Sequence, residues 1–318
     1  MMGSVKTIFG EISPNELGFV DSHDHLWKCG GMEVTHDKDF ALDNVEKCRA
    51  ELQSFVAAGG KTMVDMQPLG LGRDIEKLKA IAADLPVNVI SVTGFHKGSF
   101  YDKIHFANRY DIDQLIEMVA AEVTDGIEVN DYCGPFIKRS NTKAGLVKAG
   151  TSYYKVSALE EKLLRVVARV SKQTGIPVIT HTDYGTMGLE QVKILKAEGV
   201  EPEKICIGHL DRNPDPYYHA SVLKEGVFVQ YDCVARIKYH TVAATADLIK
   251  KFSQEGYADK LLIGGDWGRA SYFKAFGGGP GLEYLPKTFT QLLKEDYNVK
   301  EEVVRKIFYD NPSHYLAY

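Results

Sequence analysis

Short apolar runs alternate with longer amphipathic segments along the whole chain. Eight of the runs are predicted as buried strands, because they are short, largely apolar and bounded by turn residues. They cover 17–21, 61–66, 87–93, 145–150, 177–181, 204–209, 227–231 and 261–266. The pattern at 5–12 predicts a short strand or ribbon that precedes them.

The segments between these runs predict helices, because their apolar residues recur at three and four positions and would form one packed face. The expected helices cover 43–58, 73–83, 112–122, 157–174, 188–198, 216–224 and 241–255, with a last one at 299–308. Strands that alternate with helices predict an α/β protein with a parallel sheet, and eight strands close a (β/α)8 TIM barrel. We expect one domain over residues 1–318, with a doubly wound open sheet as the alternative.

Composition excludes several classes of protein. The 318 residues carry 38 Lys+Arg and 43 Asp+Glu, a net charge of -5 without a basic block, which argues against a nucleic-acid partner. No apolar stretch approaches the roughly 20 residues that span a bilayer, and the N-terminus lacks a signal-sequence pattern. The five cysteines are scattered and odd in number, as is typical of reduced thiols. We therefore expect a cytoplasmic protein without membrane contact.

Metal-ligand side chains stand at the ends of four predicted strands. His23 and His25 follow the first strand, His181 ends the fifth, His209 the sixth and Asp266 the eighth. Alternate strand residues point the same way, so His23 and His25 could present both rings to one ion. A single histidine of this kind is more often structural. Four histidines and an aspartate at the active-site end of one barrel indicate a site for Zn²⁺ or a similar divalent ion.

Lys148 is the unusual member of this set, because it lies in the small, apolar strand at 145–150. An unpaired ammonium there is unfavourable, so we expect a lowered pKa and a nucleophilic amine. Such an amine could form a Schiff base, or take up CO₂ to become a carbamate that bridges two metals. An ammonium would be repelled by two cations, which favours the carbamate.

With these residues in place, the chain resembles the phosphotriesterase-related group of the amidohydrolase superfamily over essentially its full length. The order and spacing of the matching stretches make the resemblance specific. They are Val20-Asp21-Ser22-His23-Asp24-His25, Thr62-Met63-Val64-Asp65, Pro68-Leu69-Gly70-Leu71-Gly72-Arg73-Asp74, Gly145-Leu146-Val147-Lys148, Thr180-His181, Ile207-Gly208-His209-Leu210-Asp211 and Asn311-Pro312.

The resemblance implies a binuclear metal centre, and it alone suggests a homodimer. The more buried ion would be held by His23, His25 and Asp266, the more exposed one by His181 and His209. Lys148, as N6-carboxylysine, would bridge the two ions together with a hydroxide. Zn²⁺ is expected, with Mn²⁺ or Co²⁺ as alternatives. The sequence departs from the family pattern beside the ligands, at Asp24, where Glu is common, and at Gly264-Gly265, where Ser-His is common.

Two metal ions make hydroxide available at neutral pH and polarise a carbonyl or phosphoryl oxygen. Asp266 could then accept the proton of the hydroxide and pass it to the leaving group. The site thus predicts a hydrolase for an ester, lactone, amide or phosphoester. A metal-binding protein without catalysis is the alternative from another class, and an intact ligand set argues against it.

Basic residues follow the last three predicted strands, which favours an anionic small-molecule substrate. The chain is most similar to lactonases that open phosphorylated sugar 1,4-lactones, and this branch implies phosphate binding by Arg212, Lys238, Arg269 and Tyr272. Contacts to the sugar are expected from His96, Lys97 and Tyr101. The alternative is a promiscuous carboxylesterase, phosphotriesterase or acyl-homoserine lactonase that uses the same metals. The glycine-rich segment 277–281 predicts either a lid or a turn.

Overall fold

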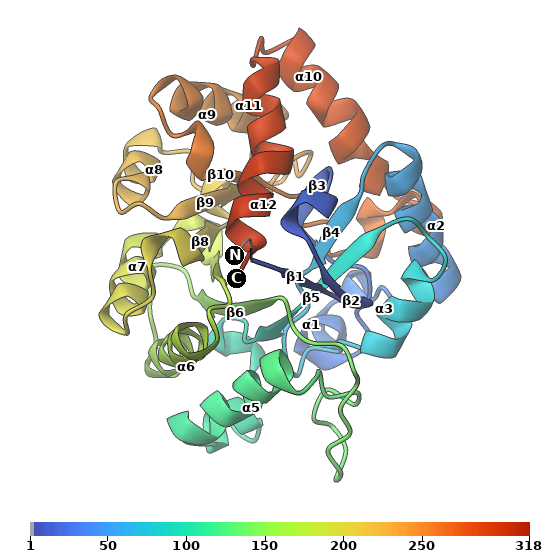
Figure 1. Ribbon diagram of the computed structural model, residues 1–318, viewed down its shortest axis with the longest axis vertical. Helices are drawn as coiled ribbons and strands as arrows, with labels where there is room; N and C mark the ends of the chain where they lie inside the picture. Colours follow the sequence, from blue (N-terminus) through green and yellow to red (C-terminus); the bar gives the residue numbers. More distant parts are fainter. Residues whose placement is uncertain (1–2) are drawn as a thin grey trace.

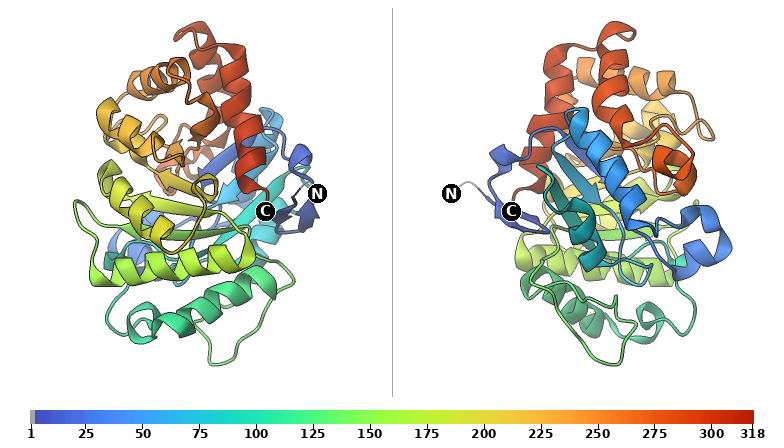
Figure 2. Two further views of the ribbon diagram at one scale, coloured as in Figure 1. Left: turned by 60° about the vertical axis from the view of Figure 1, so that its left-hand side comes forward. Right: turned by 90° about the vertical axis from the view of Figure 1, so that its right-hand side faces the viewer.

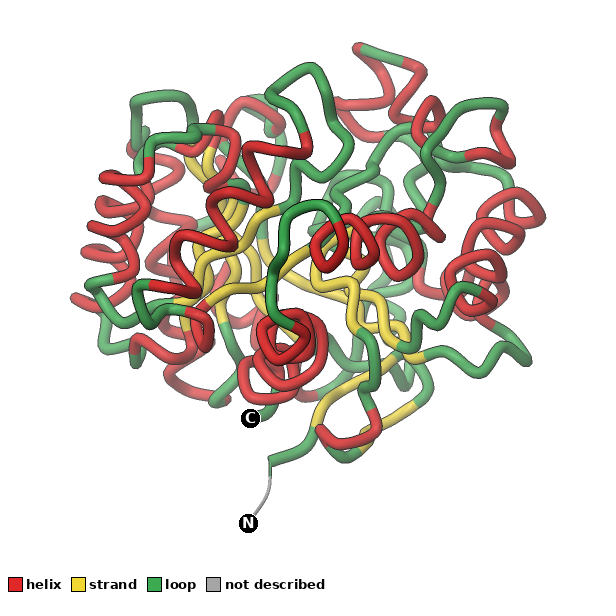
Figure 3. Tube along the Cα trace, turned by 90° about the horizontal axis from the view of Figure 1, so that it is seen from above, coloured by secondary structure: helices red, strands yellow, loops and turns green. Residues whose placement is uncertain are grey.

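The computed structural model describes residues 3–318 as a barrel of parallel strands enclosed by helices (Figures 1 and 3). Neighbouring strands pair in chain order, and the first and last strands meet where the N–H groups of Gly265 and Asp266 donate to the His23 carbonyl at 3.1 and 2.8 Å. The predicted (β/α)8 barrel is confirmed. Its strands are β3 (Val20–Asp24), β4 (Thr62–Asp65), β5 (Asn88–Gly94), β6 (Leu146–Thr151), β7 (Val178–Thr182), β8 (Ile205–Gly208), β9 (Phe228–Tyr231) and β10 (Leu261–Ile263).

The helices begin and end where their sequences provide caps. In α6, the Ser157 side chain accepts from the Glu160 N–H at the start, and Gly175 takes the left-handed conformation at the end, with φ of 77°. Side chains of Asn44, Asp74, Asp111 and Asp215 likewise accept backbone N–H groups at four other helix starts. The α-helices are α1 (Gly31–His36), α2 (Val45–Ala57), α3 (Ile75–Ala82), α4 (Phe106–Arg109), α5 (Ile112–Thr124), α6 (Ala158–Thr174), α7 (Gly188–Ala197), α8 (Pro216–Leu223), α9 (Val242–Gln254), α10 (Thr290–Glu295), α11 (Glu301–Arg305) and α12 (Asn311–Leu316).

The apolar core has two parts because side chains alternate between the faces of a strand. One part lies between strands and helices, and the other fills the barrel with residues such as Val64, Leu146 and Phe228. The N-terminal end of the barrel is closed by α12 and by the ribbon of β1 (Val5–Thr7) and β2 (Gly10–Ile12), which lie beside both chain termini (Figures 1 and 2). The ribbon expected at 5–12 is confirmed. The closed end leaves the opposite end of the barrel for the site.

Two expected boundaries are wrong for local reasons. The first strand was expected at 17–21, but Gly18 has φ of 61°, outside the strand region, and β3 begins only at Val20. The last helix was expected to end at 308, but helical turns continue to Leu316. Pro312 lacks an N–H and would clash with a carbonyl one turn back, and the wider turn at Lys306–Asp310 accommodates it.

Three further expectations concerned membrane spans, the cysteines and the glycine-rich segment. Within residues 3–318, no helix is long and apolar enough to cross a membrane. The five cysteines are free thiols, of which three are buried. The segment 277–281 forms a turn, since the N–H groups of Gly278, Gly279 and Gly281 donate to carbonyls of residues 271–273.

Candidate metal centre

The five expected ligands of metal ions meet at the carboxyl end of the barrel. His23 lies in β3 and His25 directly after it, while His181 lies in β7 and His209 follows β8. An irregular register between Asp21 and Asp24 in β3 changes the direction of the side chains there. His181 is two residues after Ile179, which lies in the barrel interior, so the His181 side chain points inward as well.

Asp266 lies among the histidines. Its Oδ1 is 3.5 Å from Nε2 of His25 and 3.7 Å from Nε2 of His23, and its Oδ2 is 3.9 Å from Nδ1 of His209. The ring centroids of His181 and His209 are 4.5 Å apart. The ligand atoms of His23, His25 and Asp266 are close enough to hold one ion together. The fold thus gathers all five residues, and their role as metal ligands stays a prediction.

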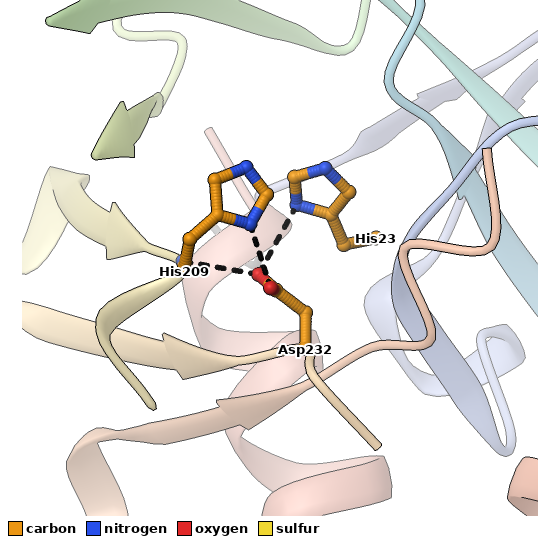
Figure 4. Close-up of side chains that lie close together, drawn as sticks. All are labelled: His23, His209 and Asp232. Carbon is orange, nitrogen blue, oxygen red and sulfur yellow. Dashed lines mark hydrogen bonds and ion pairs between the residues drawn. The ribbon is translucent and has the colours of Figure 1, made fainter. Parts of the chain in front are cut away.

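Two neighbouring side chains determine which ring nitrogen of His23 and His209 is free. The amide of Gln230 donates to the Ser22 carbonyl, so its Oε1 accepts from Nδ1 of His23 at 2.6 Å. Asp232 accepts from Nδ1 of His209, also at 2.6 Å (Figure 4). In both rings Nε2 therefore keeps its lone pair. Carboxylate or amide partners of this kind orient the histidine ligands of metal sites.

The donor set fits a divalent metal ion. Burial lowers the pKa of His23, His25, His181 and His209 well below the usual value, so these rings are neutral, as metal binding requires. Nε2 of His23 and both ring nitrogens of His181 are buried without a hydrogen-bond partner in residues 3–318. Unsatisfied buried nitrogens are unfavourable in a structural role, and coordination would satisfy them.

Lys148 projects into the same site from β6 and is almost completely buried. Its Nζ donates to the Met66 carbonyl at 3.0 Å. Burial lowers the pKa of Lys148 to about 7, so a large fraction of the amine is neutral at neutral pH. A neutral, nucleophilic amine among candidate metal ligands fits the expected carbamate.

The backbone around two candidate ligands is unusual. His209 and Asp266 have φ of 59° and 46°, a left-handed backbone conformation that residues other than glycine rarely adopt. Beside Asp266, a Cβ on Gly264 would lie 2.6 Å from the Cβ of His23, and one on Gly265 would lie 2.6 Å from the Trp267 ring. The departure from the family pattern at Gly264-Gly265 therefore reflects close packing in this wall.

The candidate ligands other than His23 line a cavity of about 240 Å³ that also contains most of the expected substrate residues. Three cations, Arg212, Arg236 and Lys238, surround the Tyr239 ring at 4.8–5.2 Å from its centroid, and we call them the rim cations. Both arginines contact the Asp266 carboxylate. Across residues 3–318, no carboxylate lies within ion-pair distance of Lys238. Burial and the nearby Arg236 lower the pKa of Lys238 to about 8.

Not all expected substrate residues are equally available. Arg269 lines the cavity, but its guanidinium pairs with Asp37 at 2.6 Å and Asp39 at 3.3 Å, so two carboxylates already offset its charge. Tyr272 lies outside the lining and packs under Arg236.

On the expected sugar side, His96 and Lys97 line the cavity. Tyr101 does not: its buried hydroxyl accepts from the His96 N–H and donates to the Leu69 carbonyl. Neither Tyr101 nor Tyr272 is among the lining residues of this cavity, and their contacts to a substrate stay predictions.

Sequence reasoning missed several residues of this site. Asp232 directly follows the strand expected at 227–231, so the rule that found His181 and His209 could have found it. Gln230 is two residues after Phe228, so both side chains point into the barrel. A polar residue at an inward position of an apolar strand indicates a candidate site residue. Lys28 and Glu33 also line the cavity, but they lie in an irregular loop and a short helix that no periodicity marks.

Asp232→Asn is expected to weaken metal binding by about 10- to 100-fold, because His209 loses the carboxylate that orients its ring. Titration of metal-free protein with Zn²⁺ in a competing chelator measures this affinity. Asp215→Asn, at the cap of α8 outside the cavity, is the control and should bind metal like the unaltered protein. Equal metal affinity of Asp232→Asn and the control would contradict the orienting role.

A barrel that gathers histidines, a carboxylate and a buried lysine at the carboxyl ends of its strands is typical of metal-dependent hydrolases. The model of the Phosphotriesterase family matches residues 3–316, and the chain belongs to this family.

Relatives and solved structures agree with this assignment. A phospho-furanose lactonase of Mycoplasmopsis synoviae (strain 53) is 40% identical, over 98% of this chain and 91% of that protein. The crystal structure of an amidohydrolase from Mycoplasma synoviae superimposes with a TM-score of 0.96 at 39% identity, covering 100% of this chain and 92% of that one. A lactonase structure from Listeria monocytogenes gives 0.92 at 35% identity, with 99% of each chain covered.

Proposed function

We propose that this enzyme hydrolyses the lactone ring of a phosphorylated five-membered sugar lactone. The observation that carries the proposal is the cavity itself, in which the candidate metal ligands other than His23 line one space together with the rim cations. Lys238, which has no carboxylate partner among the described residues, provides a site for a dianionic phosphate. The name of the relative from Mycoplasmopsis synoviae, a phospho-furanose lactonase, supports this substrate class.

The character of the cavity also supports a polar substrate. Besides the rim cations, it is lined by Lys28, Glu33, Lys97 and Asp183. Aromatic rings contribute as well, and Tyr184 and Tyr239 pack edge to face with centroids 5.8 Å apart. Acyl-homoserine lactones and organophosphates would favour an apolar lining instead, so the polar wall argues for a phosphorylated sugar.

We propose two divalent ions as cofactors, with Zn²⁺ favoured by the His/Asp donor set. His23, His25 and Asp266 would hold one ion, His181 and His209 the other, and Lys148 would contribute to both as N6-carboxylysine. To form this group, the neutral Nζ of Lys148 attacks CO₂, one N–C bond forms and one proton leaves, which creates an anion. The bound ions would supply Lewis-acid chemistry and make hydroxide available at neutral pH.

The side chains of this chain then divide the remaining work. Asp266 accepts a proton from the attacking hydroxide and delivers it to the ring oxygen as the C1–O bond breaks. The rim cations hold the phosphate and place C1 of the lactone at the metal centre. His96 and Lys97 contact the sugar. Ring opening yields the phosphorylated aldonate.

The test is a comparison of kcat/KM for a pentono-1,4-lactone with and without its 5-phosphate, measured on metal-replete protein. A preference of at least about tenfold for the phosphorylated lactone, which corresponds to about 1.4 kcal/mol in the transition state, is expected. Equal or reversed preference would contradict the phosphate pocket and favour the carboxylesterase or phosphotriesterase alternative.

Lys238→Met is expected to lower kcat/KM for the phosphorylated lactone by about 10- to 100-fold, because a charged hydrogen bond to the phosphate is lost. The rate for the lactone without phosphate should hardly change. The matched control is Lys196→Met, which removes the same charge from an exposed pair with Glu225 on the outer surface. Equal losses on both lactones would count against Lys238 as a phosphate ligand.

A further inference from the structure

An ion pair of two buried side chains, Lys28 and Glu33, also lies in the wall of the cavity. Lys28 and Glu33 both line the cavity, yet they are only 1% and 7% exposed. Nζ of Lys28 is 2.9 Å from Oε2 of Glu33. Throughout the described part of the chain, each of these groups has the other as its one ion-pair partner. The mechanism above uses neither of them.

The local sequence holds this pair in place. The backbone N–H and carbonyl of Lys28 both bond to Leu42, at 3.1 and 2.9 Å, which anchors the loop after β3. Gly30 and Gly31 have φ of 88° and 78°, and a Cβ on Gly31 would lie 3.0 Å from the backbone of Leu71. This turn lets α1 pack closely and directs Glu33 into the cavity.

Stability alone does not explain a buried ion pair at this position. Burial opposes ionisation of Glu33, but the adjacent Lys28 ammonium lowers the pKa of Glu33 overall, which favours the carboxylate form of Glu33. Removing two charges from water often outweighs their attraction, and apolar residues of similar size are as stable or more stable. Charged groups retained in a cavity wall therefore indicate a role toward a ligand.

The pair shares the cavity with a candidate metal ligand and lies next to a ring that also contacts Arg269. His25, a candidate metal ligand three residues before Lys28, lines the same cavity as the pair. On the other side, the Phe40 ring lies 4.9 Å from Nζ of Lys28 and 3.8 Å from the Arg269 guanidinium. Between C1 and C5 of a sugar lactone, the groups that remain are the ring hydroxyls at C2 and C3.

We propose that Glu33 and Lys28 form the subsite that binds the ring hydroxyls of the substrate, with Glu33 accepting and Lys28 donating hydrogen bonds. The inference rests on the proposed function, since it assigns a part of the same substrate. The pair acts on specificity: a lactone that lacks hydroxyls would leave two buried charges without their ligand.

The test compares a pentono-1,4-lactone 5-phosphate with its 2,3-dideoxy counterpart. The unaltered enzyme should prefer the hydroxylated lactone by at least about tenfold in kcat/KM. In the double variant Lys28→Met/Glu33→Leu, apolar groups of similar size replace both charges, so the fold should be retained. The preference of this double variant for the hydroxylated lactone should fall to within about threefold. The reason is that kcat/KM decreases for the hydroxylated lactone and stays the same for the dideoxy lactone. Glu33→Gln provides a second, milder variant with an intermediate preference.

The matched control is Glu122→Gln, which weakens a buried ion pair with Arg73 outside the cavity. It should lower Tm and leave the preference unchanged. A double variant that loses activity equally on both lactones, or an unaltered enzyme without preference, would overturn the subsite while lactone hydrolysis stands. An unaltered enzyme that opens neither lactone would overturn the proposed function itself.

Discussion

Lys148→Ala is expected to reduce bound metal from two ions to at most one per chain and to lower kcat/KM by more than about 100-fold. Loss of a residue that merely orients a ligand costs about 10- to 100-fold, and Lys148 would itself hold both ions. The side chain is buried among the candidate ligands. Lys148 is the one charged residue of β6, so no neighbour on that strand could replace it as a ligand. Elemental analysis of the dialysed protein and steady-state rates measure the two effects.

The carbamate gives this prediction a readout that is independent of activity. After incubation with ¹³C-bicarbonate and metal, the unaltered protein should show one carbamate carbon signal by NMR, and Lys148→Ala should lack it. Lys204→Ala is the matched control, because burial also lowers the pKa of Lys204, whose Nζ donates to the Ala317 carbonyl far from the cavity. Full activity of Lys148→Ala, with two ions bound, would refute the binuclear centre.

Asp266→Asn is expected to lower kcat by about 10²- to 10⁴-fold, the usual contribution of a group that transfers a proton in the transition state. An amide keeps the shape of the side chain but cannot accept the proton. It also leaves Arg212 and Arg236 without the carboxylate that both of them contact. KM for the phosphorylated lactone should change far less than kcat, since all three rim cations, Lys238 among them, would still be present to bind the phosphate.

Asp259→Asn serves as the control for Asp266→Asn, because Asp259 is exposed and pairs only with Lys306 among the described residues. Circular dichroism and metal content show whether the Asp266→Asn protein keeps its fold and at least one ion. A kcat within tenfold of the unaltered enzyme under those conditions would exclude Asp266 as the proton acceptor.

Residues on regular strands were the easiest part of the site to predict from sequence. His181 and His209 end apolar runs, and the rule that barrel sites lie at the carboxyl ends of strands places them together. His25 met the same expectation, although β3 is shifted to Val20–Asp24 and His25 follows the strand. The error arose at Gly18, whose positive φ interrupts a run that looks regular in sequence.

The rim was harder to predict, because a list of basic residues does not show how their charges are paired. Arg269 and Lys238 both looked like phosphate ligands. Asp37 and Asp39, more than 200 positions away in sequence, pair with Arg269, whereas no carboxylate of residues 3–318 pairs with Lys238. Tyr272 likewise packs against Arg236 outside the cavity lining.

The sequence by itself determined the barrel, the ribbon that precedes its first strand and the residues that meet at its open end. These features follow from alternation along strands, helical periodicity and the order of elements, all of which act between near neighbours in the chain. Only the tertiary structure decided which nitrogen of His209 is free, which rim cation lacks a partner and that Lys28 and Glu33 share the cavity wall. Those features depend on side-chain contacts across loops, where long-range packing sets the geometry.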